Sequence, residues 1–573
     1  HDYYKPFFSE IQDTIPALVE SVIGDYESQI HLDYPYDEFS IVEVPAHFYA
    51  YKKNFTLASE ASLPQMVLMQ ERAYTLNGAD FPRVVERFKR RRDGERSSEE
   101  MKADAFRRFI QSNFIEGEDF SRLWGSETQI TGNTKIFPNF VSYSNDFGLP
   151  QLPVMNPVLE RYIDSRGEEE ERRGFRGNRE LGNQERANLL LQKNSFAELM
   201  SDTAHFVRLS DVIDVKGDYF ISLMKHFAGQ EKFDPMLDSF IVATRYQNNT
   251  GTIFLDRMKD RYQIDADKHM QDWLYSRDLA GFIFRDIEGF TFYDDEQIRY
   301  QAEATITNTG KARGLVRLNM RMGRRRNSNY SEEKTVLLDP GTTKRVGLTV
   351  GEAPSILNAN TLVSSNLPAL LGFPLRNIED REEETGGAFT RLMDTPVPGK
   401  ETIIVDNEDA GFRVIAPEKS TKLRDLIQKQ QETDEYTGLN FWRPPEEWQK
   451  VIHDSFYGDV KLSASYVRSG QGDYKALWSV PLKDAGYYDV QVYVSDAGIP
   501  RWRRRDENRN VQYNYTIFHD DGEETIPVDV DEHEGDWISL GTYYFSPDSA
   551  RIQLTNQTKG RLVVADAVKL IRK

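Results

Sequence analysis

The chain of 573 residues contains no cysteine. That absence excludes disulfides, thiolate metal sites and cysteine nucleophiles. The sequence also lacks an apolar run of the ~18–20 residues needed to span a bilayer, and it shows no secretory signal. Because it begins abruptly at His1 and soon enters an amphipathic pattern, we expect it to be a piece of a longer protein.

Basic residues are outnumbered: 72 Lys and Arg face 92 Asp and Glu, which gives a formal net charge of -20. This balance opposes binding to nucleic acid or to anionic membranes, since both attract Lys and Arg. Two short arginine runs, 324–326 and 503–505, are expected to be solvated loops. We therefore predict no nucleic-acid partner.

Motifs of the common catalytic centres are missing as well. A zinc peptidase of the gluzincin type needs His-Glu-x-x-His, which places two imidazoles on one helix face and a glutamate beside the bound water. None of the nine histidines is followed by Glu-x-x-His. The nucleophile elbow, the P-loop and the Rossmann glycine fingerprint are also absent. We predict no catalytic residue, no metal and no cofactor.

Hydrophobic periodicity divides the chain into a first part that becomes mostly helical and a second part that is β. Strands are predicted at 39–45 and 64–69, and helices at 183–200, 215–228, 233–245, 253–262 and 268–274. From Gln297 onward, apolar residues alternate and Asn/Gly or Pro/Gly turns separate the short strands. This pattern is typical of a β-sandwich.

Four stretches in the first part resemble the catalytic domain of aminopeptidase-N-like gluzincins. They are YPYDEFSIVEVP at 34–45, Lys216-Gly217 with the apolar helix after it, FDPML at 233–237 and WLYSRDLAGF at 273–282. The resemblance covers about residues 1–285. Chains of this pattern resemble the extracytoplasmic half of a Bacteroidetes protein type that joins an ABC-transporter permease to an aminopeptidase-like region.

The chain lacks three sequence elements that the peptidase active site needs. Besides the zinc motif, the substrate-binding Gly-x-Met-Glu-Asn element is replaced by ASEAS at 58–62. The tyrosine that usually stands two residues before Lys-Gly is Asp214. We therefore expect a scaffold that has lost catalysis, because function depends on the site and not on the fold.

A second resemblance covers about residues 402–573. The stretches IIVDNEDAGF (403–412), ALW (476–478), AGYYDV (485–490), GDWISLG (535–541) and VVADAV (563–568) resemble a golvesin C-terminal-like domain, related to a module of xanthan lyase. The resemblance implies a jelly-roll-like β-sandwich of the carbohydrate-binding kind.

The predicted fold class is multidomain α+β. A degenerate aminopeptidase-like, mostly helical domain occupies 1–290, and an Ig-like β-sandwich follows at 291–375. Residues 376–401, which are rich in acids, glycine and proline, are expected to form a linker. A jelly-roll-like β-sandwich completes the chain at 402–573.

Aromatic side chains in the last domain are the candidates for ligand binding, since sugar sites stack aromatic faces against sugar C–H faces. We select Trp442, Trp448, Tyr457 and Trp502; the first two lie beside Pro444-Pro445 in a predicted loop, where binding residues are common. Trp478 and Trp537 lie in alternating strands and are expected to be core residues.

Three functions remain open. The first is a non-catalytic periplasmic module of an ABC-type transporter, tethered to the inner membrane through a permease portion, that binds an envelope protein or polymer. The second is a secreted polysaccharide-binding protein. The third is a hydrolase with a divergent centre, for which Glu116 and Glu118 are the nearest paired carboxylates.

Overall fold

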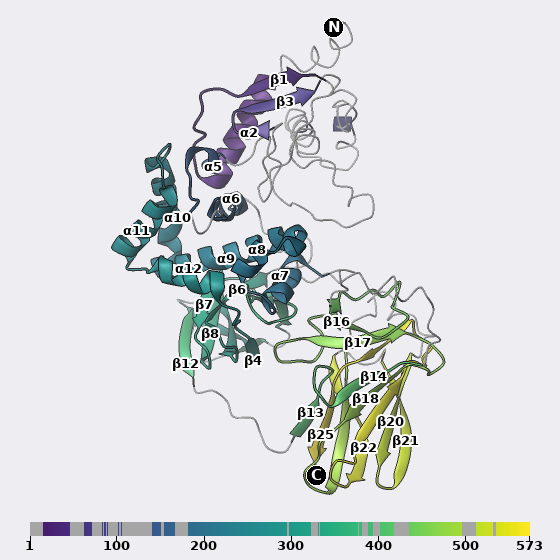
Figure 1. The fold of residues 1–573 in the computed structure, drawn as a ribbon. Coiled ribbons are helices and arrows are strands. Elements are labelled where there is room, and N and C mark those ends of the chain that lie inside the picture. Colours follow the sequence, from purple (N-terminus) through teal and green to yellow (C-terminus); the bar gives the residue numbers. More distant parts are fainter. Residues whose placement is uncertain are drawn as a thin grey trace. The chain divides into compact units, whose positions relative to one another are not determined.

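The structure is a computed structural model that describes residues 15–45, 62–70, 83, 85–86, 89, 101, 105, 140–149, 154–166, 181–294, 297–322, 330–331, 333–375, 378–380, 388–393, 402–417, 435–495, 511–530 and 535–573. The chain divides into two compact units, each built from two segments. Unit 1 comprises His1–Arg173 and Asp202–Tyr275, and unit 2 comprises Gly174–Ser201 and Ser276–Lys573. Figure 1 shows the elements of both.

Unit 1 combines a small sheet with helices. The sheet has the order β1-β3-β2, formed by β1 (Ser40–Val44), β2 (Ser62–Leu63) and β3 (Met66–Gln70), which confirms the predicted strands. The helices are α2 (Ile15–Ile30), α5 (Val141–Ser144), α6 (Met155–Ser165), the 3-10 helix η4 (Thr203–Arg208), α9 (Leu209–Ala228), α10 (Gln230–Ala243), α11 (Thr250–Tyr262) and α12 (Ala266–Tyr275).

The longest helix of this group, α9, packs closely against α6. Its buried face carries apolar residues at helical spacing, among them Ile213, Phe220 and Met224. A Cβ added at Gly217 would lie 2.9 Å from a methyl carbon of Val158 in α6. Glycine at this position therefore allows the two helix backbones to approach each other.

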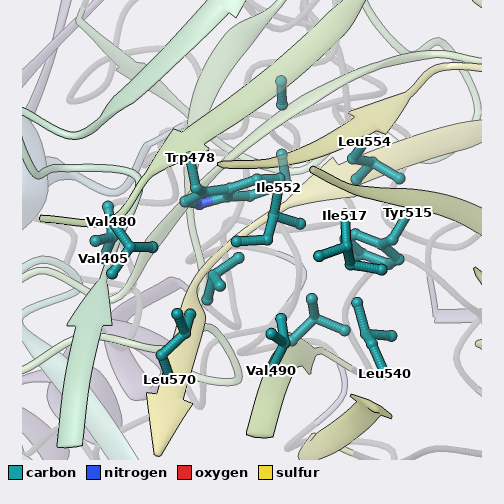
Figure 2. Packing of buried hydrophobic residues seen from close by; sticks show 14 of the residues in the cluster. Val405, Trp478, Val480, Val490, Tyr515, Ile517, Leu540, Ile552, Leu554 and Leu570 are labelled. Atoms are coloured by element: carbon teal, nitrogen blue, oxygen red, sulfur yellow. The ribbon is translucent and has the colours of Figure 1, made fainter. Parts of the chain in front are cut away.

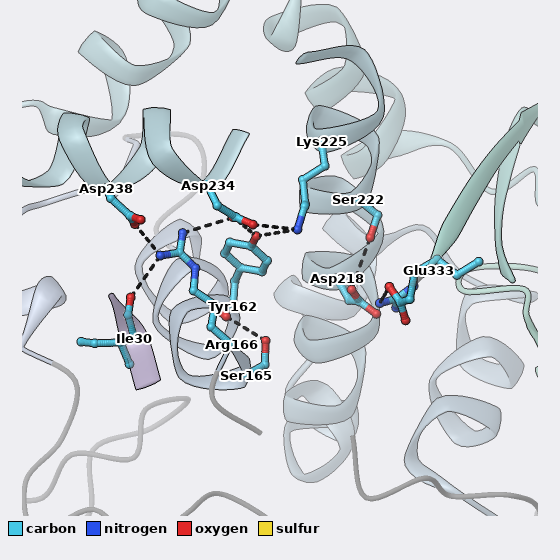
Figure 3. A network of polar contacts seen from close by, with 11 residues as sticks. Ile30, Tyr162, Ser165, Arg166, Asp218, Ser222, Lys225, Asp234, Asp238 and Glu333 are labelled. Carbon is cyan, nitrogen blue, oxygen red and sulfur yellow. Dashed lines mark hydrogen bonds and ion pairs between the residues drawn. The ribbon is translucent and has the colours of Figure 1, made fainter. Parts of the chain in front are cut away.

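An arginine connects three elements of unit 1 (Figure 3). The side chain of Arg166, which directly follows α6, is 7% exposed and donates to Asp238 of α10 and to the carbonyl oxygen of Ile30 at the end of α2. Its second nitrogen lies 3.3 Å from Asp234, a carboxylate that also pairs with Lys225 of α9 at 3.1 Å. One guanidinium thus balances two carboxylates that would otherwise repel each other.

Replacing Arg166 by Met keeps the bulk of the side chain but leaves Asp234 and Asp238 without the guanidinium. Because an unpaired, partly buried carboxylate is costly, we expect unit 1 to lose about 3 kcal/mol of stability. Hydrogen exchange of α6 and α10 during urea titration measures this loss. The control Lys259→Met, at an exposed position of α11, should change stability by no more than about 0.5 kcal/mol. Equal effects of the two substitutions would contradict the prediction.

The first part of unit 2 is a β-structure of two sheets. One sheet has the order β10-β9-β6-β7 and the other β11-β4-β5-β8-β12, and strands of both contribute to one hydrophobic core. The strands are β4 (Phe282–Asp294), β5 (Gln297–Asn308), β6 (Gly314–Met322), β7 (Lys334–Leu338), β8 (Thr343–Val350), β9 (Pro354–Asn360), β10 (Leu370–Pro374), β11 (Ile378–Asp380) and β12 (Phe389–Met393).

Three expectations for this region need correction. The β-region begins at Phe282 rather than at 291, because β4 pairs with β5 from its first residue. The expected linker at 376–401 contains β11 and β12, which add to the edges of the second sheet. The expected helix 183–200 is two helices, α7 (Asn183–Leu191) and α8 (Phe196–Ser201).

The helix α7 belongs to unit 2 and not to unit 1, which holds the other long helices described above. Its side chains donate to the end of β9 and to the loop after it: Gln184 Nε2 to Asn360 Oδ1 at 2.8 Å, and Asn188 Nδ2 to the carbonyl oxygen of Leu362 at 2.9 Å. The carboxylate of Glu185 accepts a hydrogen bond from the backbone of Ala369. These polar contacts hold α7 in unit 2, although the chain before residue 174 and from 202 to 275 belongs to unit 1.

The second part of unit 2 has three sheets. Their orders are β13-β25-β19-β22, β14-β18-β23-β20-β21 and β15-β16-β17-β24. The strands are β13 (Thr402–Val405), β14 (Phe412–Ile415), β15 (Tyr436–Thr437), β16 (Gln449–Ile452), β17 (Ser463–Arg468), β18 (Lys475–Ser479), β19 (Gly486–Val494), β20 (Gln512–His519), β21 (Gly522–Asp529), β22 (Asp536–Phe545), β23 (Arg551–Thr555), β24 (Leu562–Ala565) and β25 (Val568–Arg572).

The first two of these sheets face each other across one apolar core (Figure 2). Val490 and Leu570 come from one sheet and Ile517, Ile552 and Leu554 from the other, all fully buried. Trp478 is 1% exposed, as expected for a core residue. Its indole nitrogen donates to the carbonyl oxygen of Asp566 at 3.1 Å, which satisfies the buried N–H.

Truncating Ile552 to Ala removes methyl and methylene groups from the centre of this core, where neighbouring side chains cannot fill the space. We expect a loss of about 2–5 kcal/mol in the free energy of unfolding, measured by urea titration with tryptophan fluorescence. Val414→Ala, at a 43% exposed position of β14, is the matched control and should have little effect. A small effect of Ile552→Ala would indicate a loosely packed core.

Candidate ligand-binding face

The outer face of the sheet β13-β25-β19-β22 gathers aromatic and polar side chains. Along β19, alternate residues from Tyr488 to Val494 are buried in the core, so the intervening residues point outward. The antiparallel register places Tyr493 opposite Trp537, Gln491 opposite Ser539 and Tyr487 opposite Tyr544.

An irregularity in β22 brings these residues to one face. Trp537 and Tyr544 are seven positions apart, so a regular strand would point them to opposite faces. The register shifts between Val490 and Gln491 of the partner strand, and Leu540 becomes an extra residue directed into the core. Gly541 follows with φ of +128°, a backbone conformation that favours glycine.

Three half-buried aromatic rings cluster at one end of this face; we call Tyr457, Tyr493 and Trp537 the aromatic cluster. Ring centroids are 5.0 Å apart for Tyr457 and Trp537, 5.4 Å for Tyr493 and Trp537, and 5.7 Å for Tyr457 and Tyr493. Lys569 of β25 holds its ammonium 4.2 Å from the centroid of Trp537. Rings that hold one another at steep angles form a preorganised apolar surface.

Two further tyrosines form a pair at the other end of the same face. The rings of Tyr487 and Tyr544 lie 5.2 Å apart in an edge-to-face arrangement. They are 60% and 37% exposed, respectively. Tyr493 follows Tyr487 by six positions along β19, so the tyrosine pair and the aromatic cluster lie roughly 20 Å apart at about 3.4 Å per residue.

Between the two aromatic groups, Asp489 organises polar side chains. The hydroxyl of Ser539 donates to one carboxylate oxygen at 2.5 Å, and Gln491 Nε2 donates to the other at 2.9 Å. Lys573 Nζ lies 3.6 Å from the same carboxylate. Burial acts to raise the pKa of Asp489, but these hydrogen bonds and the charge of Lys573 outweigh it and lower the pKa. The carboxylate stays ionised and fixes its neighbours.

The structure places the predicted ligand-binding residues in different environments. Tyr457 belongs to the aromatic cluster. Trp442 is 44% exposed, in the loop before β16, with its ring 5.1 Å from the guanidinium carbon of Arg561. Trp448 is half-buried and packs against the core, contrary to the expected exposure. Trp502 lies outside the described residues, as do Glu116 and Glu118.

Trp537 was expected in the core, and this was wrong: the alternation of Trp537 with Ile538 was correct, but it is Ile538 that faces the core. Tyr493, Tyr487 and Tyr544 were not selected as site residues. The available signal was the alternation in 486–494 together with glycine at 541, which marks a bulge within a strand.

Among the described residues, no group of three or more Asp, Glu or His side chains is gathered as a metal ion would require. No helix in the same part of the chain is long and apolar enough to cross a membrane.

Comparison with known proteins gives one family match. Residues 440–572 match the family model of the Golvesin C-terminal domain. The match spans β16 to β25, and it contains the aromatic cluster, the tyrosine pair and Asp489. No curated protein matches the chain.

Solved structures give weak likenesses only. A Paenibacillus xanthan lyase is 16% identical with a TM-score of 0.22, over 51% of this chain and 26% of that one. The CBM22-1–GH10 modules of Clostridium thermocellum xylanase 10B, solved with xylohexaose, are 15% identical with a TM-score of 0.15, over 22% of this chain and 25% of that one. The chain thus spans about a quarter of each.

Proposed function

We propose that the C-terminal β-domain binds a polysaccharide on the outer face of the sheet β13-β25-β19-β22. One observation carries the proposal: a single face presents two aromatic groups with a fixed polar row between them. Aromatic rings contact the C–H faces of sugar rings, and the polar row of Gln491, Ser539 and Lys573 offers hydrogen bonds to hydroxyl groups. The match of this region to the Golvesin C-terminal domain is consistent with such a role.

The geometry favours an extended chain over a single sugar. The two aromatic groups are roughly 20 Å apart along β19, a length that one sugar ring cannot bridge. A linear polysaccharide lying along the strand would contact both groups at once, and its affinity would combine the two contacts. A monosaccharide or a chain end would reach only one of them.

The first test removes the centre of the aromatic cluster. We expect Trp537→Ala to weaken binding to soluble polysaccharides at least tenfold, because a packed aromatic side chain at a binding surface is typically worth 2 kcal/mol or more. A glycan array identifies the ligand, and isothermal titration measures the affinity. Trp442→Ala, at a 44% exposed tryptophan in the loop before β16, should leave the affinity unchanged. Loss of binding in Trp442→Ala alone would move the site to that loop.

The second test addresses chain length. The double variant Tyr487→Ala/Tyr544→Ala should lose affinity for long oligosaccharides but retain the wild-type affinity for short ones, which reach only the aromatic cluster. Titration with a length series of the array ligand measures this difference. Tyr293→Ala, at a 65% exposed tyrosine of β4, is the control. Equal loss for all lengths would contradict binding across both groups.

The transporter function stays a prediction. We propose on the sequence resemblance alone that residues 1–285 derive from an aminopeptidase-like scaffold without catalytic activity. On the same ground we propose that the native protein lies in the periplasm, tethered to the inner membrane. A permease encoded directly upstream of His1 would support this proposal. Zinc-dependent peptidase turnover of the purified chain would refute the loss of catalysis.

A further inference from the structure

A lysine lies in the middle of the candidate face. Lys569 is the second residue of β25, between the core residues Val568 and Leu570, so its side chain points to the outer side of the sheet. The register pairs it with Gln491 of β19 on one side and with Ile404 of β13 on the other. The face therefore presents an ammonium group beside its polar row.

The ammonium of Lys569 is held by an aromatic ring and not by a carboxylate. It lies over the ring of Trp537, 4.2 Å from the centroid. Among the described residues, no carboxylate forms an ion pair with it and no side chain forms a hydrogen bond with it. The carboxylate of Asp536 instead accepts the backbone N–H of Trp537 at 2.7 Å.

The other lysine of this face has a carboxylate partner. Lys573 Nζ lies 3.6 Å from Asp489, whose two oxygens also accept hydrogen bonds from Ser539 and Gln491. The charge of Asp489 is thus balanced by Lys573, and its hydrogen-bonding capacity is largely used within the face. Lys569 is left as a cation that no described carboxylate neutralises at close range.

The position of Lys569 favours the arrival of a negative charge. The side chain is half-buried, and burial lowers the pKa of Lys569 against the opposing influence of Asp489 and Asp536. An opposite charge beside the ammonium would compensate for the lost hydration. A cation–ring contact is weaker than a charge-assisted hydrogen bond, so an anionic group can draw the ammonium away from Trp537.

We propose that the outer face of the sheet β13-β25-β19-β22 selects an acidic polysaccharide, and that Lys569 pairs with the carboxylate groups on its sugar rings. This inference rests on the proposed function and adds the class of sugar to it. A sugar that packs on the aromatic cluster places a carboxylate on its ring within reach of Lys569, because the ammonium already contacts Trp537 of that cluster. A neutral sugar offers hydroxyl groups only and leaves the charge unpaired.

The overall charge of the chain makes this selection informative. With a formal net charge of -20, the chain repels polyanions at long range. Salt screens such repulsion beyond about 8 Å under physiological conditions, so the charges in direct contact with the ligand decide. A preference for an acidic polymer therefore requires a local cation, and Lys569 supplies one.

The test uses the full chain and two pairs of polymers that share a backbone and differ in charge. The pairs are polygalacturonate with its methyl ester, and carboxymethyl cellulose with hydroxyethyl cellulose. Affinity electrophoresis and isothermal titration measure the binding. At low ionic strength we expect the acidic member of at least one pair to bind about tenfold tighter than the neutral member, because hydrogen bonds to charged groups are the stronger ones. Added sodium chloride should reduce this difference.

Variants of Lys569 assign the preference to this residue. Lys569→Met keeps the apolar stem of the side chain and removes its charge, so the acidic and neutral members of a pair should bind about equally. Lys569→Arg keeps the charge and should keep the preference. Lys559→Met, at an exposed lysine in the connection between β23 and β24, is the matched control and should behave as the wild type does.

The outcomes separate this inference from the proposed function. Binding of neutral polymers without a preference for the acidic ones would overturn the inference and leave polysaccharide binding intact. A preference that persists in Lys569→Met would remove the role assigned to that residue. A wild-type chain that binds none of the four polymers and no sugar of a glycan array would overturn both proposals.

Discussion

The extra residue in β22 is the constraint on which the candidate face depends. Strand pairing alone would direct Trp537 and Tyr544 to opposite sides of the sheet, one of them into the core. Inserting Leu540 into the core and placing Gly541 at a positive φ resets the alternation midway along the strand. Both aromatic groups then lie on the outer face, while the core keeps a continuous apolar lining.

A second constraint joins the core to the edge of the domain. Trp478 lies in the centre of the sandwich, yet its N–H must be satisfied, and the carbonyl oxygen of Asp566 does this. The same residue accepts the backbone of Tyr457 through its carboxylate. Asp566, in the connection between β24 and β25, therefore links the position of the core residue Trp478 to that of Tyr457, whose ring lies on the outer face.

Periodicity in the sequence predicted the elements well where one face of an element is uniformly apolar. The stretch 486–494 alternates without interruption and is β19 along its whole length. Periodicity did not predict to which unit an element belongs, because distant contacts decide this. The helix α7 is helical as predicted, but Gln184 and Asn188 bind the end of β9 and the loop after it, so α7 belongs to unit 2. The glycine- and proline-containing stretch 376–401 includes edge strands because a neighbouring sheet supplies their hydrogen bonds.

The candidate face was predicted only in part for the same reason. Tyr457 was selected from its residue type, but Trp537 was assigned to the core because the alternation gives two faces and does not say which is inside. A bulge changes that assignment within a strand, and local composition does not reveal its register.

The passage of the chain between the two units has a consequence for biosynthesis. Residues 174–201 belong to unit 2, whereas residues 202–275 belong again to unit 1. Neither unit is complete when its first segment leaves the ribosome. The contacts of α7 lie in strands synthesised after residue 276, and α6 packs against α9, which is synthesised later, while Arg166 after α6 pairs with α10. Each unit thus exposes unsatisfied surface during synthesis, and no cut at a single position can separate the two units from each other.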